Sequence, residues 1–115
     1  MRMWMINPKL MCDKHLLGEH GEIHKNRHNF VKKHKVTGRI IPFVQIEPQS
    51  MLSRHDELAV EMVSRGMNHK SLYEMPSISH LPLNEQIAKA NIQRNVVDLA
   101  NRCKSCAALI NEAIL

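Results

Sequence analysis

Residues 92–114, IQRNVVDLANRCKSCAALINEAI, carry the clearest structural signal in the chain. Their apolar side chains recur at steps of three and four residues, which is the period of a helix with one apolar face. The positions in this stripe are Ile92, Val96, Leu99, Ala100, Cys103, Ala107, Ile110 and Ile114. The spacing predicts one amphipathic helix over this stretch.

Two more helices are predicted before it. The first is expected over about residues 8–35, because Asn7-Pro8 has the pattern of an N-cap followed by proline at the first helical position. The second is expected from Ser50 or Ser53 to Arg65, and the glycine that follows is a typical helix stop.

The connecting segments have loop composition. Pro42 and Pro48 argue against a central strand in residues 40–50, and residues 67–83 are rich in serine, proline and methionine. We therefore predict that residues 1–115 form a single all-α domain, compact, with three main helices and long connecting loops.

Positive charge is concentrated at the N-terminal end. Residues 1–39 hold nine basic and three acidic residues, whereas residues 40–115 hold seven basic and eight acidic ones. With a sequence pI near 9.4, this favours a polyanionic partner such as nucleic acid. No apolar run approaches the roughly 18 residues of a membrane-spanning helix, and the N-terminus does not resemble a signal peptide. We expect no membrane partner, a cytoplasmic location and a monomer.

The basic residues cluster between His24 and Arg39, a stretch that contains six cations and no acid. On a helix, Lys25, Lys32 and Lys33 lie close to one face, which suits binding along a phosphate backbone. Such a run is more often only a solvated face, but the charge asymmetry of the chain favours nucleic acid.

The middle of the first helix, residues 18–29, has Ile23 as its only large apolar residue. Gly18 and Gly21 each cost a helix about 1 kcal/mol relative to alanine. A segment with few apolar side chains and low helix propensity is a candidate ligand site. On the sequence alone, the simpler interpretation is a solvated helix face, which we prefer.

Two sets of residues have metal-ligand spacing. His20, His24 and His28 align on one helix face, but they lack the glutamate of a zinc-protease motif. Cys103-Lys-Ser-Cys106 forms a four-ligand set with Cys12 and His15 only if the two ends of the chain meet. Because Cys103 lies on the apolar stripe, where a free cysteine acts as a small hydrophobe, we expect no metal and no cofactor.

The N-terminal amine is a candidate nucleophile. Its reference pKa of roughly 7.7–8.0 leaves it substantially neutral at cellular pH. A neutral amine attacks an aldehyde-like sugar carbon to form an imine, as Schiff-base lysines do. A cation such as Arg2 lowers that pKa further, and because Arg2 is bulky we expect Met1 to be retained.

Part of the chain resembles a known family, the bacteriophage endonuclease V type of pyrimidine-dimer DNA glycosylase and abasic-site lyase. Asp13-Lys-His-Leu-Leu-Gly-Glu-His-Gly-Glu22-Ile23 is similar to its Asp-Gln-His-Leu-Met-Ala-Glu-Tyr-Arg-Glu-Leu, and Lys-Lys-His at 32–34 resembles its Arg-Lys-His. Ser64-Arg-Gly-Met-Asn-His-Lys70 resembles Lys-Arg-Gly-Phe-Asn-Ile-Lys. The match is gapless back to Met1-Arg2, where the family has Thr-Arg, and is loose in the last third.

The resemblance implies roles for the residues at matching positions. The α-amine of Met1 would be the nucleophile, Glu22 the essential carboxylate, and Arg2 a residue that holds the strand and tunes the amine. His15 would support the pocket. With the basic face considered above, the implied DNA-binding positions are Arg2, His15, His20, Lys25, Lys32, Lys33 and Arg94.

The chain departs from the family pattern at several positions. Gly21 replaces an arginine beside the glutamate, His20 replaces a tyrosine, and the aromatic C-terminal tail of the family is absent. We expect these departures to affect which damaged base is recognised more than they affect the imine chemistry.

The mechanism that the resemblance implies begins with bending of duplex DNA and extrusion of a nucleotide at the lesion. The Met1 amine then displaces the base at C1′, and Glu22 assists proton transfer before β-elimination nicks the strand. Two alternatives stay open from the residues alone. One is a non-catalytic helical DNA-binding module. The other is a small zinc-stabilised nucleic-acid-binding domain built on Cys12, His15, Cys103 and Cys106.

Overall fold

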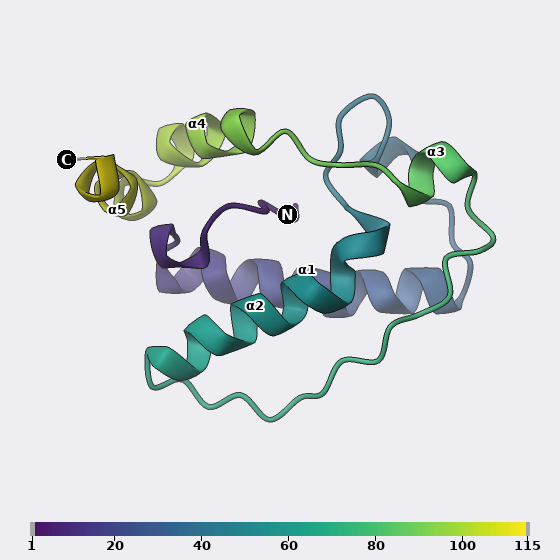
Figure 1. The fold of residues 1–115 in the computed structure, drawn as a ribbon, viewed down its shortest axis with the longest axis horizontal. Helices are drawn as coiled ribbons and strands as arrows, with labels where there is room; N and C mark the ends of the chain where they lie inside the picture. The colour runs from purple at the N-terminus through teal and green to yellow at the C-terminus, as the bar shows by residue number, and fades with distance from the viewer. Residues whose placement is uncertain (1, 115) are drawn as a thin grey trace.

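The computed structural model describes residues 2–114 and contains helices but no strands over that range (Figure 1). This confirms the predicted all-α class. The α-helices are α1 (Asp13–Val31), α2 (Met51–Ser64), α3 (Leu83–Gln86), α4 (Ile92–Arg102) and α5 (Lys104–Ile114), and the 3-10 helices are η1 (Pro8–Leu10), η2 (Thr37–Arg39) and η3 (Pro48–Ser50). None of the helices described is both long enough and apolar enough to span a membrane.

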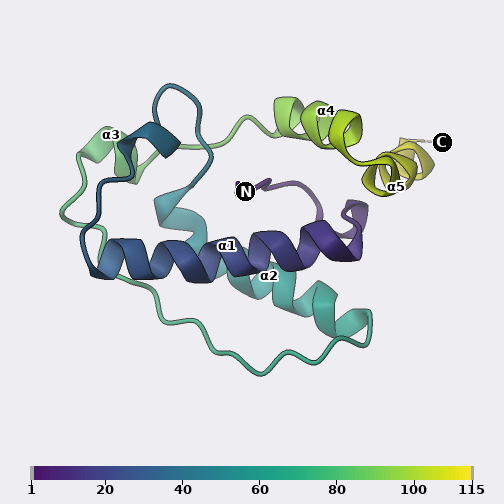
Figure 2. The same cartoon turned by 180° about the vertical axis from the view of Figure 1, so that it is seen from behind.

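The helices form two groups with the N-terminal segment between them. Helix α1 packs against α2, whereas α4 and α5 pack against each other and α5 contacts η1. Figures 1 and 2 show the N-terminal segment running between α1 and α4, while the long connector from α2 to α3 follows the edge of the molecule. This arrangement places the start of the chain beside helices from both of its halves.

The buried side of α1 is partly polar. Its buried positions follow helical spacing and are Leu16, Glu19, Glu22, Ile23, Asn26 and Phe30. The polar middle of this helix is therefore not simply a solvated face, and the interpretation we preferred from the sequence is wrong on this side. A carboxylate is stable in the protein interior only when it is paired or hydrogen-bonded. We therefore expect Glu19 and Glu22 each to contact a polar group from another element.

The first helix begins later than predicted. Asn7 caps η1, because its side-chain oxygen accepts a hydrogen bond from the Lys9 N–H at 3.1 Å. The chain then extends at Met11 and Cys12, and α1 starts at Asp13 with Cys12 as its N-cap residue. The cap and proline signal was real, but it marks a separate 3-10 turn.

The second helix agrees with the prediction. It runs from Met51 to Ser64, and Gly66 follows it with φ +81°. A positive φ strains any residue with a side chain, which explains the glycine at this stop.

The third predicted helix is divided. Cys103 has φ −136° and ψ 114°, an extended conformation that separates α4 from α5. The prediction of a single helix over residues 92–114 is therefore wrong. Part of the predicted apolar stripe is buried in each helix, Leu99 in α4 and Ile110 in α5, whereas Ile92 at its start is exposed.

A buried ion pair joins α1 to α2. The guanidinium of Arg54 donates Nε to Glu19 Oε2 at 2.5 Å and Nη2 to Glu19 Oε1 at 2.9 Å. The Arg54 and Glu19 side chains are 1% and 0% exposed. Arg54 Nη1 also donates to the Ile6 carbonyl at 2.7 Å. This two-pronged contact fixes α1, α2 and the N-terminal segment relative to one another.

Candidate active site and DNA-binding surface

Glu22 lies on the buried side of α1 with 7% of its side chain exposed. Arg39 of η2 places its Nη2 atom 2.6 Å from Glu22 Oε1. Asn26, one turn further along α1, donates from Nδ2 to the same oxygen at 3.4 Å. The carboxylate is therefore held in place by an arginine and an asparagine from two different elements.

The proposed nucleophile, the amine of Met1, lies outside the described residues. The next residue, Arg2, is held by α4, because its Nη1 donates to Asn95 Oδ1 at 3.0 Å and to Asp98 Oδ2 at 3.2 Å. Its guanidinium also lies 4.5 Å from the centre of the Trp4 ring. Asn95 donates in turn to the Trp4 carbonyl at 2.8 Å, so α4 fixes both the backbone and the side chains at the start of the chain.

The loop from Arg39 to Gln45 links the N-terminal segment to Glu22. The Met3 N–H donates to the Gln45 carbonyl at 2.7 Å, and the Gln45 N–H donates to the Arg39 carbonyl at 2.7 Å. The side chain of Arg39 then reaches Glu22. Residues 2–3 and Glu22 are thus held against the same loop.

Two cavities open next to this segment, with volumes of about 320 Å³ and 420 Å³. Arg2 and Gln45 line both of them. The basic residues that line one or the other are Arg2, Lys89, Arg94 and Arg102, and neither has an acidic residue among its described lining. Such a surface attracts phosphate groups.

Arg94, which the resemblance assigns to DNA binding, lies at the first cavity. It lines the first cavity, is 51% exposed, and stacks on the exposed ring of Phe43 with 4.1 Å between its Cζ and the ring centre. The structure therefore pairs this arginine with an aromatic residue that the sequence had not singled out.

The predicted lysines are exposed. Lys25 lies on α1, Lys32 caps its C-terminal end, and Lys33 follows with φ +56°. Steps of three and four residues lead from Glu22 to Lys25, Asn29 and Lys32, which places the exposed lysines along one edge of the buried side on which Glu22 lies.

The two predicted histidines have separate environments. His15 lines the second cavity with Trp4, and the two rings meet edge-on with centres 6.1 Å apart. Burial, with a smaller effect of Lys14, lowers the pKa of His15. His20 lines neither cavity. Its Nε2 lies 3.2 Å from His55 Nε2 and 3.0 Å from His69 Nε2.

His20 therefore belongs to a group of four imidazoles. His24 completes it, with its ring centre 4.7 Å from that of His20, whereas His28 is exposed and pairs with His34. Burial, with smaller effects of the neighbouring imidazoles, lowers the pKa of His20 to about 4. Burial likewise lowers the pKa of His24, so both rings are neutral at pH 7. His20, His24 and His55 have their nitrogens close enough to share a metal ion.

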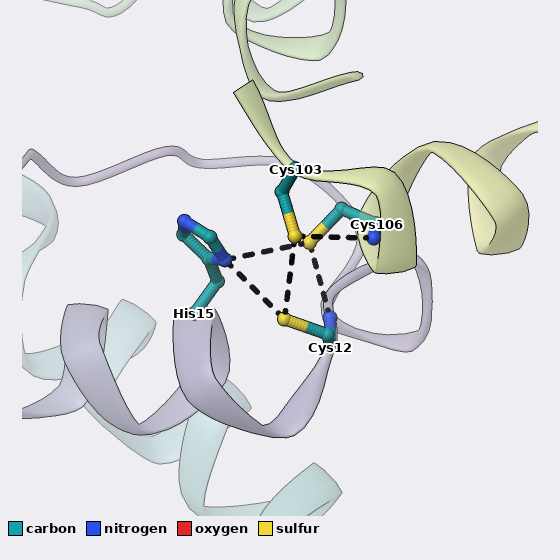
Figure 3. A group of neighbouring side chains, drawn as sticks. All are labelled: Cys12, His15, Cys103 and Cys106. Carbon is teal, nitrogen blue, oxygen red and sulfur yellow. Dashed lines mark hydrogen bonds between the residues drawn. The ribbon is translucent and has the colours of Figure 1, made fainter. Parts of the chain in front are cut away.

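A second group of metal-ligating side chains joins the two ends of the chain (Figure 3). The ligand atoms of Cys12, His15, Cys103 and Cys106 all lie within 4.8 Å of one another. Burial raises the pKa of the Cys106 thiol to about 12, whereas the backbone N–H of Cys106 lowers the pKa of Cys103. The condition that the sequence set for a four-ligand group, that the ends of the chain meet, is fulfilled.

Several residues near these groups had no predicted role. Arg39 was counted only as one of six cations, and Gln45 lay in a predicted loop. His55 and His69 gave no periodic signal because they come from different segments, although His69 falls within the stretch that resembles the family's second motif. Contacts between distant segments carry no local spacing by which they could be found.

Comparison with known proteins identifies the family. A model of the pyrimidine dimer DNA glycosylase family matches residues 1–75, which include Arg2, Glu22 and the Arg39–Gln45 loop. No match was found among curated proteins or among solved structures. The family match confirms the resemblance seen in the first 35 residues and in residues 64–70. The chain therefore belongs to the pyrimidine dimer DNA glycosylase family, whose activity is base excision in DNA repair.

Proposed function

We propose that this glycosylase removes the damaged base by attack of its own N-terminal amine on C1′ of the nucleotide and then nicks the strand as an abasic-site lyase. The observation that carries the proposal is the link from Met3 through Gln45 and Arg39 to Glu22, because it holds the start of the chain and a buried carboxylate against one loop.

Binding is the first step. The cations that line the cavities, together with Lys25, Lys32 and Lys33, bind the phosphate backbone of duplex DNA. Bending of the duplex and extrusion of a nucleotide at the lesion cost a few kcal/mol, and a damaged base costs the least to unstack. In this proposal the cavities next to Arg2 receive the extruded nucleotide, and their basic lining supports this assignment.

Base excision follows. The neutral amine of Met1 forms a bond to C1′, the glycosidic bond breaks, and the base leaves with its electron pair and takes up a proton. Glu22 stabilises the positive charge that develops on the sugar and assists the proton transfers that open the ring and form the imine. The amine is neutral in sufficient amount because the ordinary pKa of an α-amine is roughly 7.7–8.0.

Strand cleavage completes the reaction. The imine acidifies the C2′ proton, and its removal by a base expels the 3′ phosphate, so that the strand is nicked by β-elimination. Water then releases the sugar fragment from the amine. All of these steps use groups of the chain itself, with no cofactor.

Borohydride trapping tests the proposal. We expect a covalent protein–DNA adduct when the protein is reduced in the presence of a duplex with an abasic site, and also with a duplex that contains a cyclobutane pyrimidine dimer. The control is the same protein acetylated at the N-terminus, which keeps every side chain and should give no adduct. Peptide mass spectrometry should place the adduct on residue 1.

The outcome separates the enzyme from its rival. DNA binding without any trapped adduct would support a non-catalytic DNA-binding module. An adduct on a lysine side chain would support the lyase activity but would assign the nucleophile to that lysine rather than to the N-terminal amine. The monomeric state and the cytoplasmic location stay predictions, which sedimentation and cell fractionation can check.

A further inference from the structure

We propose that Cys12, His15, Cys103 and Cys106 bind one zinc ion that fastens the C-terminal helices to the start of α1. This inference is independent of the proposed reaction. It replaces our expectation of a metal-free chain.

The distances between the ligand atoms fit one tetrahedral ion. Cys12 Sγ lies 3.3 Å from His15 Nδ1 and 3.8 Å from Cys103 Sγ, and Cys106 Sγ lies 3.7 Å from His15 Nδ1. Zinc bonds of about 2.3 Å to sulfur and 2.0–2.1 Å to nitrogen give tetrahedral edges of about 3.8 Å between two sulfurs and 3.6 Å between sulfur and nitrogen. The three separations given above lie within about 0.3 Å of these edges, and all four ligand atoms lie within 4.8 Å of one another. Figure 3 shows the four side chains facing a common centre.

The local backbone is built alike in the two halves of the site. Cys12 is the N-cap residue of α1 and His15 lies in its first turn; Cys103 immediately precedes α5 and Cys106 lies in its first turn. Both pairs therefore project from helix N-termini, where the helix dipole favours thiolates. The backbone N–H of Cys12 donates to Cys106 Sγ at 3.2 Å, and the N–H of Cys106 donates to Cys103 Sγ at 3.4 Å. Amide donors of this kind further stabilise thiolate charge.

The break between α4 and α5 supports the site independently. The apolar stripe runs unbroken from residue 92 to residue 114, and residues 101–106 contain neither glycine nor proline. Nothing in the local sequence explains why the helix ends at Cys103. A ligand at that position explains it, because the extended conformation of Cys103 turns its sulfur toward Cys12. The same break removes our objection that Cys103 is only an apolar helix residue.

The donor set and its surroundings favour zinc. Three thiolates and one imidazole are typical of structural zinc sites, and the spacing leaves room for a single ion. Such a centre carries one net negative charge, and the residues that flank its ligands in sequence include the cations Lys14, Arg102 and Lys104. A disulfide is a poorer account, because its sulfurs bond at about 2.05 Å and it leaves one thiol and His15 unexplained.

The site has a structural consequence for the N-terminus. Four protein ligands leave no open position, so the ion is structural rather than catalytic. It fixes α4 and α5 against α1, and α4 in turn holds Arg2 through Asn95 and Asp98. Removal of the metal should therefore loosen the segment that carries the N-terminal amine.

Metal analysis of the full-length protein, purified under reducing conditions without chelators, tests the site. We expect one zinc per chain in the wild type and in Ser105→Ala, the control within the CxxC stretch, and no stoichiometric zinc in the combined Cys103→Ser and Cys106→Ser variant. Titration of metal-free wild type with Co²⁺ should give the intense visible bands of a tetrahedral ion and a thiolate charge-transfer band. This measurement does not depend on whether the variant folds.

Three results would overturn the proposal. The first is wild-type protein without stoichiometric zinc and without the cobalt bands. The second is a thiol count of one in place of three in the denatured, metal-free protein kept from air, which would indicate a disulfide. The third is a metal ion that persists in the folded double variant and gives cobalt spectra without thiolate bands, which would place it at the imidazole group around His20.

Discussion

Arg39 Nη2 lies 2.6 Å from Glu22 Oε1, although the two residues belong to different helical elements. Gly21, next to Glu22, stands where the family pattern has an arginine, and a Cβ added at Gly21 would meet nothing within 4 Å. In this chain a cation reaches the carboxylate from η2. This arrangement keeps a positive group at the site while leaving open space beside it.

Replacement of Glu22 by glutamine should abolish base excision without preventing DNA binding. Glutamine keeps the size of the side chain and an oxygen for Arg39, but it cannot take up a proton or stabilise a positive sugar. We expect single-turnover excision to fall by roughly 10²–10⁴-fold, the usual contribution of general acid–base catalysis. Fluorescence anisotropy should show affinity close to wild type. Exposed Glu112 changed to glutamine is the control, and undiminished excision in Glu22→Gln would refute the assigned role.

The sequence was most informative where structure depends on neighbouring residues. The glycine stop at Gly66, the cap at Asn7 and the stripe of the last helices are all local signals, and all three are present in the structure. The N-terminal match also assigned a role to Glu22; the structure buries this residue beside Arg39, and its role stays a prediction.

The sequence was least informative where polar groups are buried. Two interior positions of α1 carry glutamate because Arg54 and Arg39 come to Glu19 and Glu22 from other elements. Hydrophobic periodicity cannot detect such a face, since it counts only apolar residues. The break at Cys103 was missed for a related reason, because the side chains that we propose share an ion with Cys103 include Cys12 and His15 at the start of α1.

The buried pair of Arg54 and Glu19 should dominate the response of the fold to mutation. Arg54→Met leaves the Glu19 carboxylate buried without its cation, and we expect a loss of about 3–5 kcal/mol in the free energy of unfolding. Urea denaturation measures it. The double variant Arg54→Met and Glu19→Met should recover much of this loss, because two apolar side chains replace the pair. Arg65→Met, which breaks partly exposed ion pairs, should cost no more than about 1 kcal/mol. Equal losses in Arg54→Met and Arg65→Met would contradict the assignment.

Acid should destabilise the protein through the imidazole group around His20. The unfolded histidine binds a proton near pH 6.5, whereas burial lowers the pKa of folded His20 to about 4. The unfolded state therefore binds more protons between these values, and stability falls as the pH drops from about 6.5 toward 4. The groups that face His20 are His24, His55 and His69, and they add to the penalty of its charge.

Comparison with His20→Asn isolates this effect. We expect the wild type to lose about 1–2 kcal/mol more than the variant between pH 7.5 and pH 5, a figure reduced for the partial exposure of the ring. Urea midpoints at the two pH values measure the difference. If low pH also releases the metal ion that we propose at His15, this release occurs in both proteins, so its effect on stability cancels in the comparison. An equal change in unfolding free energy between the two pH values for wild type and variant would show that the pKa of His20 is not lowered in the folded protein.

Arg94 should contribute a phosphate contact that responds to salt. Its guanidinium stacks on Phe43 at the edge of the cavity that Arg2 also lines, so it is both exposed and held in position. Arg94→Ala should weaken binding to duplex DNA and reduce the slope of log K against log salt by about 0.9, the value for one lost phosphate contact. Arg94→Lys should restore most of the slope, because lysine keeps the charge. Lys70→Ala, a cation on the connector that lines neither cavity, is the matched control. An unchanged slope in Arg94→Ala, or an equal reduction in Lys70→Ala, would show that the DNA does not follow this surface.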